Sequence, residues 1–410
     1  MKKDVAIVGA GHAGVSLAFA LRNLGFAGSL ALLSDEADLP YHRPPLSKAF
    51  MAAGDDAESE RRLQLESAEF YAEKGIDLLL DSPVESIEPA SHGLLLRNGE
   101  RLEYGHLVLA TGARARRLPL PGAELQGIQT LRTLEDARRI RQRLATSQRV
   151  VVVGGGFIGL ELAATAAALG KQVTVLENAS RIMERSVAPL VSEYVAQRHA
   201  GKGIRIETGC RVSAFRGDGG QVCAVLGENG EWPADLVIVG AGAQPNSELA
   251  EAAGIACGNG ILVDGQMRTS APDVFAIGDC AAHENPYAGN ARIRLESIQN
   301  ANDQARVVAQ VIHGDACARY HTVPWFWSDQ GEIKLQMIGL SADRTDCVVR
   351  GEPASGRFSV FHYRGDELIG VDSINQPLDH ITSRKLLAAG LSPDKAAVAN
   401  TSVELKSLLG

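Results

Sequence analysis

The chain has 410 residues, of which 45% are hydrophobic and 22% charged, and its formal net charge is −8. This composition is typical of an ordinary folded protein with two or three domains. The negative charge gives no support to nucleic-acid binding, and no segment offers the ~20 clean apolar residues of a membrane span. Two lysines precede an apolar start, but its glycine pattern and the lack of a clear cleavage site argue against a secretory signal. We therefore expect a cytoplasmic protein with no nucleic-acid and no membrane partner.

Two glycine-rich segments have the same G-x-G-x-x-G spacing. Each follows an apolar run that predicts a buried parallel strand (Val5–Val8, Val150–Val153), and each precedes a predicted helix (Val15–Leu24, Leu160–Leu169). In such a turn the first glycine allows the bend, the second lets a pyrophosphate approach, and the third lets helix and strand pack closely. The pattern predicts two bound dinucleotides, with these candidate binding residues: Gly9, Gly11, His12, Ala13, Gly14, Gly154, Gly156, Phe157, Ile158 and Gly159.

Acidic residues follow the next predicted strand of each half. Glu177 ends the run Val173–Leu176, and an acid at this position accepts hydrogen bonds from ribose hydroxyls and repels a 2′-phosphate. This favours NADH over NADPH. In the first half, Asp35 and Glu36 follow the run Leu30–Leu33, and we expect Asp35 to hold a ribose. The alternative for each acid, a solvated residue without a ligand, stays open at this point.

Two further segments point to a flavin. Leu107–Arg116 is a predicted strand ending in Ala110-Thr111-Gly112, and Thr269–Asp279 is a strand-like run ending in Gly278-Asp279. With the two glycine motifs, they resemble the two-dinucleotide flavoprotein disulfide-reductase superfamily. The resemblance implies that the Ala-Thr-Gly segment closes an FAD site and that Asp279 bonds the ribityl chain. Gly242, in the Gly/Pro-punctuated stretch Gly242–Asn246, is also assigned to cofactor binding.

The cysteines argue against thiol chemistry at the flavin. None of the six occurs in the first 209 residues, and no C-x-x-C is present; they are Cys210, Cys223, Cys257, Cys280, Cys317 and Cys347. Thiol–disulfide exchange needs a thiolate nucleophile near the flavin, so a disulfide reductase is not expected. Metal-ligand spacing is absent as well, so no metal site is expected. We expect all six to be reduced, buried, small apolar residues.

Four other segments narrow the family. RPPLSK (Arg43–Lys48), GGGFIGLELAA, RLESIQNANDQA (Arg294–Ala305) and PWFWSDQ (Pro324–Gln330) resemble the putidaredoxin reductase-like family, the NADH:ferredoxin reductases of bacterial oxygenase systems. The similarity covers nearly the whole chain. It implies electron flow from NADH through FAD to a 2Fe–2S ferredoxin, which supplies a cytochrome P450 or a Rieske-type aromatic-ring dioxygenase.

The same resemblance assigns roles to individual residues. It implies that Glu161 holds the nicotinamide carboxamide, that Lys48 and Glu296 lie near the flavin, and that Trp327 faces the ferredoxin; these four form the catalytic set. A basic patch of Arg292, Arg294 and Arg306 would suit an acidic ferredoxin. Cofactor contacts are expected at Ala13, Asp35, Arg43, Lys48, Val84, Ala110, Arg132, Asp279, Ser297, Ile298 and Trp325.

The expected fold class is α/β, with two Rossmann-like domains and a C-terminal α+β domain. We assign residues 1–117 and 246–322 to the FAD domain, 118–245 to an inserted NAD domain, and 323–410 to the third domain; 205–239 is expected to be an antiparallel excursion. A monomer suffices for this function. Two alternatives stay open: an NADH oxidase, quinone or rubredoxin reductase on the same scaffold, and a binding flavoprotein similar to the apoptosis-inducing factor.

Overall fold

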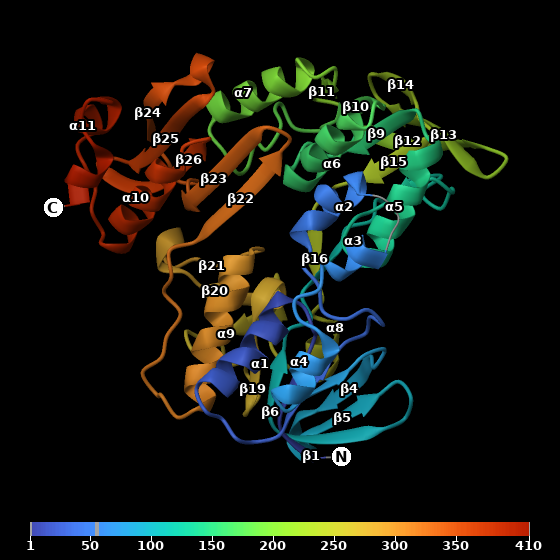
Figure 1. Ribbon diagram of the computed structural model, residues 1–410, viewed down its shortest axis with the longest axis vertical. Helices are drawn as coiled ribbons and strands as arrows, with labels where there is room; N and C mark the ends of the chain where they lie inside the picture. The colour runs from blue at the N-terminus through green and yellow to red at the C-terminus, as the bar shows by residue number, and fades with distance from the viewer. Residues whose placement is uncertain (1, 54–56, 410) are drawn as a thin grey trace. The chain divides into compact units, whose positions relative to one another are not determined.

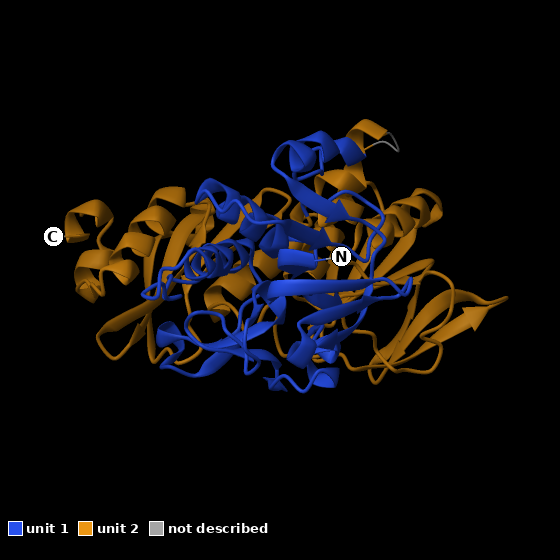
Figure 2. Ribbon diagram, turned by 90° about the horizontal axis from the view of Figure 1, so that it is seen from below, with its two compact units in different colours: residues 1–42, 60–114, 244–324 blue, residues 43–59, 115–243, 325–410 orange. Residues whose placement is uncertain are grey.

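The computed structural model describes residues 2–53 and 57–409, and its chain separates into two compact units. Unit 1 comprises residues 1–42, 60–114 and 244–324, and unit 2 comprises residues 43–59, 115–243 and 325–410 (Figure 2). The segment 43–59 therefore clusters with unit 2 and not with the rest of the predicted FAD domain. The three-domain division itself stays a prediction.

Unit 1 is built on a largely parallel sheet with the strand order β3-β2-β1-β6-β5-β4, in which β19 also pairs with β6. Val5 to Val8 and Leu30 to Leu33 are buried along their whole length, as expected for strands covered on both faces. Val8 is in register with Leu33 and Leu109, and Leu109 with Ala276, so these strands end at one edge. The strands are β1 (Lys2–Val8), β2 (Leu30–Leu33), β3 (Ile76–Leu79), β4 (Val84–Glu88), β5 (Gly93–Leu96), β6 (Arg101–Leu109) and β19 (Val274–Ala276).

The predicted strand run Thr269–Asp279 is wrong over most of its length, because only β19 within it is a strand. Pro272 has no backbone N–H to donate to a ladder, and Asp273 has φ +58°.

Helices and a small second sheet, β17-β18-β20-β21, complete unit 1 (Figure 1). They are α1 (His12–Asn23), α4 (Ala68–Glu73), α8 (Glu248–Ala252), α9 (Ile298–Ile312), η2 (Pro89–Ser91), η3 (Gly278–Cys280), η4 (Pro286–Ala288), β17 (Cys257–Gly258), β18 (Gly260–Val263), β20 (Ala281–Glu284) and β21 (Arg292–Arg294).

Unit 2 contains a second parallel sheet, β11-β10-β9-β15-β8, and beside it the antiparallel sheet β12-β13-β14. The predicted antiparallel excursion is confirmed only for β12 to β14, because the flanking strands β11 and β15 pair in parallel with β10 and β9. The elements are β8 (Ile128–Gln129), β9 (Arg149–Val153), β10 (Gln172–Leu176), β11 (Arg205–Glu207), β12 (Val212–Asp218), β13 (Gln221–Gly227), β14 (Gly230–Pro233), β15 (Leu236–Val239), α5 (Leu134–Thr146), α6 (Phe157–Ala168) and α7 (Pro189–Ala200).

The C-terminal part of unit 2 is an antiparallel sheet in the order β22-β23-β26-β25-β24, with helices after it. The expected α+β character of this part is confirmed. Its elements are β22 (Trp325–Gln330), β23 (Ile333–Gly339), β24 (Asp346–Glu352), β25 (Arg357–Arg364), β26 (Glu367–Ile374), α10 (Pro377–Ala388), α11 (Lys395–Ala399), η5 (Pro353–Ser355) and η6 (Leu405–Leu409). The remaining short elements are η1 (Pro44–Ser47), α2 (Ala49–Ala52), α3 (Ala57–Arg61), β7 (Ala113–Ala115) and β16 (Ala243–Pro245).

A buried arginine on β24 fixes the end of the chain. The guanidinium of Arg350 donates to the carbonyl oxygens of Val398 (3.0 Å), Asn400 (2.9 Å) and Val403 (2.8 Å). Its Nε lies 3.7 Å from Asp379. Because Arg350 is only 8% exposed, these carbonyls have little access to water as a substitute partner.

We predict that Arg350→Met lowers the free energy of unfolding by about 3 kcal/mol, because it removes the donor of three backbone carbonyls and the positive charge beside Asp379, which keeps its hydrogen bond from Ser359. The measurement is urea denaturation followed by tryptophan fluorescence. Arg364→Met is the matched control, since Arg364 on neighbouring β25 makes an exposed ion pair with Glu367. Its unfolding midpoint should stay close to that of the wild type. Equal midpoints for both variants would contradict the assigned role of Arg350.

Candidate functional site

The first and third glycines of both motifs are required by the protein itself. Gly9 and Gly154 each have φ +111°, and a Cβ on them would lie 2.2 Å from Ala110 O and 2.4 Å from Gly240 O. A Cβ on Gly14 would lie 2.0 Å from Gly9 O, and one on Gly159 would lie 2.3 Å from Gly154 O. The two units therefore contain the same tight strand–turn–helix geometry, as the spacing predicts.

No contact within the described residues requires a glycine at the middle position of either motif. Among the described residues, no atom lies within 4 Å of a Cβ on Gly11 or Gly156. Their φ angles of −78° and −81° are open to any residue. Each is the N-cap of its helix, α1 or α6, and makes no side-chain capping bond there. Uncapped backbone N–H groups at a helix N-terminus suit a bound phosphate. Phosphate binding is the role predicted for both positions.

Acidic residues lie at the same edge of the unit 1 sheet. Asp35 is exposed, whereas Glu36 accepts a hydrogen bond from Tyr41 Oη at 2.6 Å. Backbone bonds from Ser82 to Ser34 (2.7 Å) and from Asp81 to Glu36 (3.1 Å) hold the segment leading to Val84 against this turn. Asp35, Glu36 and Val84 are thus brought to one region of unit 1.

The turns after β6 and β19 complete this edge. Thr111 Oγ1 donates to Asn246 O at 2.6 Å, and Asn246 Nδ2 donates back to Thr111 O at 2.9 Å, which fixes the Ala110-Thr111-Gly112 turn. Gly278 N donates to Gln304 Oε1 of α9 at 2.7 Å. Ser297 caps α9 by accepting from Asn300 N, so Ile298 begins the helix. On the other side of the edge, His12 Nε2 lies 3.2 Å from His42 Nδ1.

The predicted basic patch is wrong. The side chain of Arg294 is only 8% exposed, and it donates to Asp279 O (2.9 Å) and to Glu296 (2.6 Å). Arg292 pairs with Glu284, and Arg306 with Asp303. The sequence shows where the positive charges are, but only the fold shows that acidic neighbours pair with all three. Glu296 is itself 41% exposed, with Arg294 as its ion-pair partner.

In unit 2, Glu177 connects the glycine turn to the turn after β10. Its Oε2 accepts from Gly155 N at 2.6 Å, and its Oε1 accepts from Ala179 N at 2.7 Å. Gly242, with φ +97°, follows β15 and accepts from Arg116 N at 2.9 Å. The turn of Gly240 to Gly242 therefore flanks Gly154 as Ala110 to Gly112 flanks Gly9.

A buried carboxylate lies one turn into α6. Glu161 is 5% exposed, and its Oε2 lies 2.7 Å from Lys48 Nζ and accepts from Ser47 Oγ at 2.6 Å. Its Oε1 accepts from Ser328 Oγ of β22 at 2.7 Å. Sequence reasoning found Lys48 and Glu161 separately but missed their ion pair and both serines. The only local signals were the hydroxyls next to predicted residues in PLSK and WFWSDQ.

The hydrogen-bonded chain continues away from Glu161. Gln330 Nε2 donates to Ser328 Oγ at 3.2 Å, and Gln330 Oε1 lies 2.8 Å from His199 Nε2 of α7. Burial lowers the pKa of His199, against the opposing effect of its bond with Gln330. A neutral His199 that donates to Gln330 fits this arrangement. The chain thus joins β22 and α7 to the buried carboxylate.

The remaining predicted residues of unit 2 fall into two groups. Arg43 Nη1 donates to Arg132 O at 2.7 Å, so these two lie together at the N-terminus of α5. The aromatic group contains Phe157, whose ring lies 5.0 Å from that of Phe326, and Trp325, whose ring lies 5.6 Å from that of Trp327. Both tryptophans are half-buried, and Ile158 is 47% exposed, so these apolar side chains reach the surface of unit 2.

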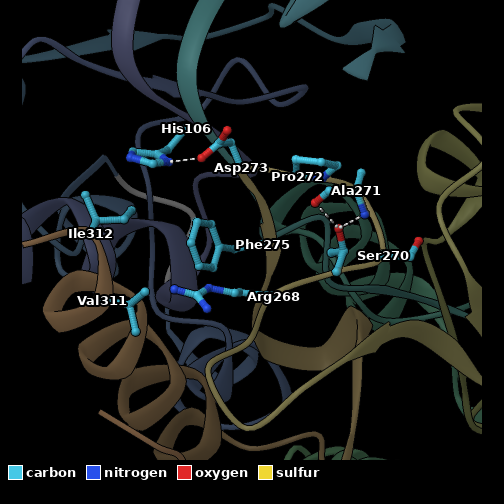
Figure 3. A pocket seen from close by; sticks show the side chains of 10 residues that line it. His106, Arg268, Ser270, Ala271, Pro272, Asp273, Phe275, Val311 and Ile312 are labelled. Carbon is cyan, nitrogen blue, oxygen red and sulfur yellow. Dashed lines mark hydrogen bonds and ion pairs between the residues drawn. The ribbon is translucent and has the colours of Figure 1, made fainter. Parts of the chain in front are cut away.

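A pocket of about 430 Å³ lies elsewhere in unit 1 (Figure 3). His106, Arg268, Phe275 and Val311 line it, together with Asp273, which lies 3.3 Å from His106 Nδ1. The loop that lines the pocket precedes β19, so the pocket lies at the amino end of the sheet. Dinucleotides bind beyond the carboxyl ends of such strands. It is not the predicted cofactor site.

The described residues offer neither a metal site nor a membrane span. Across residues 2–53 and 57–409, no group of three or more His, Cys, Asp or Glu side chains could hold a metal ion. Over the same described part of the chain, no helix is both long and apolar enough to cross a bilayer.

Paired glycine turns on parallel sheets are typical of an oxidoreductase that uses a flavin and a pyridine nucleotide. Residues 3–305 match the family model described as pyridine nucleotide-disulphide oxidoreductase, and residues 325–409 match the reductase C-terminal model. The chain belongs to this family, and it is an enzyme that uses a flavin and a pyridine nucleotide.

Similar proteins narrow the class to ferredoxin reductases. A ferredoxin–NAD(P)(+) reductase from Sphingomonas sp. is 43% identical over 94% of this chain and 93% of its own. Putidaredoxin reductase CamA of Pseudomonas putida is 42% identical over 99% of this chain and 96% of its own. The crystal structure of the ferredoxin reductase for the CYP199A2 system of Rhodopseudomonas palustris has a TM-score of 0.96 and 44% identity, over 99% of this chain and 100% of that one.

The contrast between the middle and third glycines can be measured. We predict that Gly156→Ala keeps the wild-type melting temperature but raises KM for the pyridine nucleotide at least roughly tenfold, because the new methyl group occupies space that only a ligand needs. Gly159→Ala is the matched variant, and its methyl group meets Gly154 O. It should lower the melting temperature clearly. Unchanged KM in a folded Gly156→Ala protein would contradict the assignment.

Proposed function

We propose that this protein is an NADH-dependent ferredoxin reductase that passes electrons from NADH through FAD to a 2Fe–2S ferredoxin. The observation that carries the proposal is the pair of glycine turns whose middle residues the protein itself leaves uncovered. The similarity to ferredoxin reductases along almost the whole chain supports it. The reduced ferredoxin would supply a cytochrome P450 or a Rieske-type dioxygenase. A cytoplasmic monomer is adequate for this task.

Unit 1 fits the adenine dinucleotide portion of FAD. The N-terminus of α1 and the bare backbone at Gly11 suit the pyrophosphate, and exposed Asp35 is available to ribose hydroxyls. Asp279 lies after β19, and Ile298 begins α9, at the same edge of the unit 1 sheet. Arg43, Lys48 and Arg132, the other proposed flavin contacts, belong to unit 2.

Unit 2 fits NADH. The N-terminus of α6 suits the pyrophosphate, and Glu177 places negative charge where a 2′-phosphate would lie. A carboxylate has about four lone-pair positions. Glu161 uses two on Oε2, for Lys48 and Ser47, and one on Oε1, for Ser328. Oε1 therefore keeps one acceptor position, which suits an N–H of the nicotinamide carboxamide.

When bound, FAD would supply the chemistry that links a two-electron hydride donor to a one-electron carrier. The protein's own task is to position the two cofactors and to balance their charge. Lys48 supplies a cation for negative charge on a reduced flavin, and its ion pair with Glu161 holds its ammonium in place. Trp325 and Trp327, half-buried on β22, are proposed to lie on the side that meets the ferredoxin.

The test is anaerobic stopped-flow absorbance of the flavin-loaded protein mixed with NADH and then with a panel of electron acceptors. We expect fast flavin bleaching by NADH, and then reduction of one 2Fe–2S ferredoxin far faster than of rubredoxin, quinone or oxygen. Preferred transfer to one of the other three would replace the ferredoxin with that acceptor. No bleaching on a catalytic timescale would leave only a binding role for the cofactors.

Nucleotide preference gives a separate prediction. Glu177→Gln should raise kcat/KM for NADPH relative to NADH roughly tenfold, because it removes the charge that repels the 2′-phosphate. The matched control is Glu207→Gln on adjacent β11, where the acid pairs with Arg205. That variant should keep the wild-type ratio. Equal ratios in all three proteins would show that Glu177 does not select the nucleotide.

A further inference from the structure

Three adjacent strands of the C-terminal sheet place a cysteine, a histidine and an aspartate in line. Cys347 of β24 is in register with His362 of β25, and its Sγ lies 3.5 Å from His362 Nδ1. On the other side of the ring, His362 Nε2 lies 2.9 Å from Asp372 Oδ2 of β26. Each imidazole nitrogen thus faces one polar side chain, the order of groups found in a nucleophile–base–orienter arrangement.

The three side chains differ sharply in exposure. His362 is completely buried and Asp372 is 2% exposed, whereas Cys347 is exposed on the edge strand. The expectation that all six cysteines are buried is therefore wrong, because Cys317 and Cys347 are exposed and only Cys210 and Cys280 are buried. Asp372 Oδ2 also accepts from Ala188 N at 3.0 Å, which fixes the carboxylate behind the ring.

The imidazole of His362 carries positive charge at neutral pH. Burial alone lowers its pKa, but the charge and hydrogen bond of Asp372, with a smaller effect from Cys347, raise the pKa of His362 to about 9. An imidazolium next to sulfur favours the thiolate, the nucleophilic form of cysteine. An exposed sulfur with a buried, oriented cation behind it meets the requirements of a reactive thiol.

We propose that Cys347, His362 and Asp372 form a reactive-thiol site that is oxidised by small hydroperoxides. The thiolate sulfur attacks one peroxide oxygen, an S–O bond forms, and the O–O bond breaks. The sulfur loses two electrons and becomes a sulfenic acid, while the peroxide is reduced. His362 donates its Nδ1 proton to the departing oxygen, which leaves as water or an alcohol. Asp372 is a positioning residue that acts through His362.

Cys317 provides an internal control in the same molecule. It is the other exposed cysteine, and among the described residues its sulfur makes no hydrogen bond. The full-length flavin-loaded protein is treated with hydrogen peroxide, trapped with dimedone, and analysed by mass spectrometry. We expect Cys347 to be labelled at least roughly tenfold faster than Cys317 at pH 7. Equal or slower labelling of Cys347 would overturn the proposal without any mutation.

Two variants test the part played by Asp372. Asp372→Asn keeps the shape and an acceptor for Ala188 N but removes the charge, so we expect Cys347 to lose most of its advantage over Cys317. Asp366→Asn is the matched control, because Asp366 is an exposed carboxylate that pairs with Lys395 of α11. It should keep the wild-type ratio. A folded Asp372→Asn protein with an unchanged ratio would contradict the role of Asp372.

The pH profile of iodoacetamide labelling separates charge stabilisation from mere exposure. An ordinary thiol loses reactivity about tenfold per pH unit below about 8.5. The excess of Cys347 labelling over Cys317 labelling should be present below about pH 9, where His362 keeps its charge, and should be lost in Asp372→Asn. The other charged groups near the site are Asp346 and Lys395, beside Cys347, and Arg181, which interacts with Asp372, Arg344 and Glu184. An ordinary profile for wild-type Cys347 would also overturn the proposal.

Discussion

The close approach of two backbone segments is the constraint on which both nucleotide-binding parts depend. At Gly9 and at Gly154 the chain passes directly against the carbonyl of the residue that follows a neighbouring strand, Ala110 or Gly240. Any side chain at these glycines would push the turn away from the sheet. Because the turn stays in place, the helix after it begins at the sheet edge with its N-terminus bare. The phosphate-binding geometry is thus a consequence of backbone packing, and the two halves share it despite different side chains.

The buried carboxylate of Glu161 depends on its partners, because burial of a charge costs free energy that these partners must offset. Removing a carboxylate from water costs several kcal/mol, and an ion pair alone often fails to compensate. Here Lys48 and two serine hydroxyls share the task, and they come from two segments outside α6: η1 with Lys48 directly after it, and β22. The network therefore joins the nucleotide-binding part of unit 2 to its C-terminal sheet. A group used in this way is restrained in orientation yet still has a lone pair for a ligand.

The sequence predicts a feature well when the residues that form it are close together along the chain. The glycine spacing, the acids after β2 and β10, and most strands are local, and the structure confirms the turns and strands. Contacts such as those of Glu161 with Lys48 and Ser328 join segments more than a hundred residues apart, so no spacing rule reaches them. The basic patch failed for a different reason: Glu296 is only two residues from Arg294, but no spacing rule shows that the side chain of Arg294 turns inward to Asp279 O. The long strand predicted before Asp279 is wrong for a local reason, because Pro272 has no backbone N–H to donate to a strand ladder.

The C-terminal sheet shows how strand register can create chemistry that composition hides. Cys347, His362 and Asp372 are 15 and 10 residues apart, spacings that match no helical or metal-binding pattern, and only antiparallel pairing brings them into line. The buried histidine–aspartate pair has a desolvation cost that apolar residues of similar volume would avoid. A purely structural role would not require an exposed sulfur at one end of that pair. The lack of cysteine in the first 209 residues keeps thiols out of both glycine motifs, but it does not remove thiol chemistry from the protein. The edge of the C-terminal sheet is the place where this fold can support it.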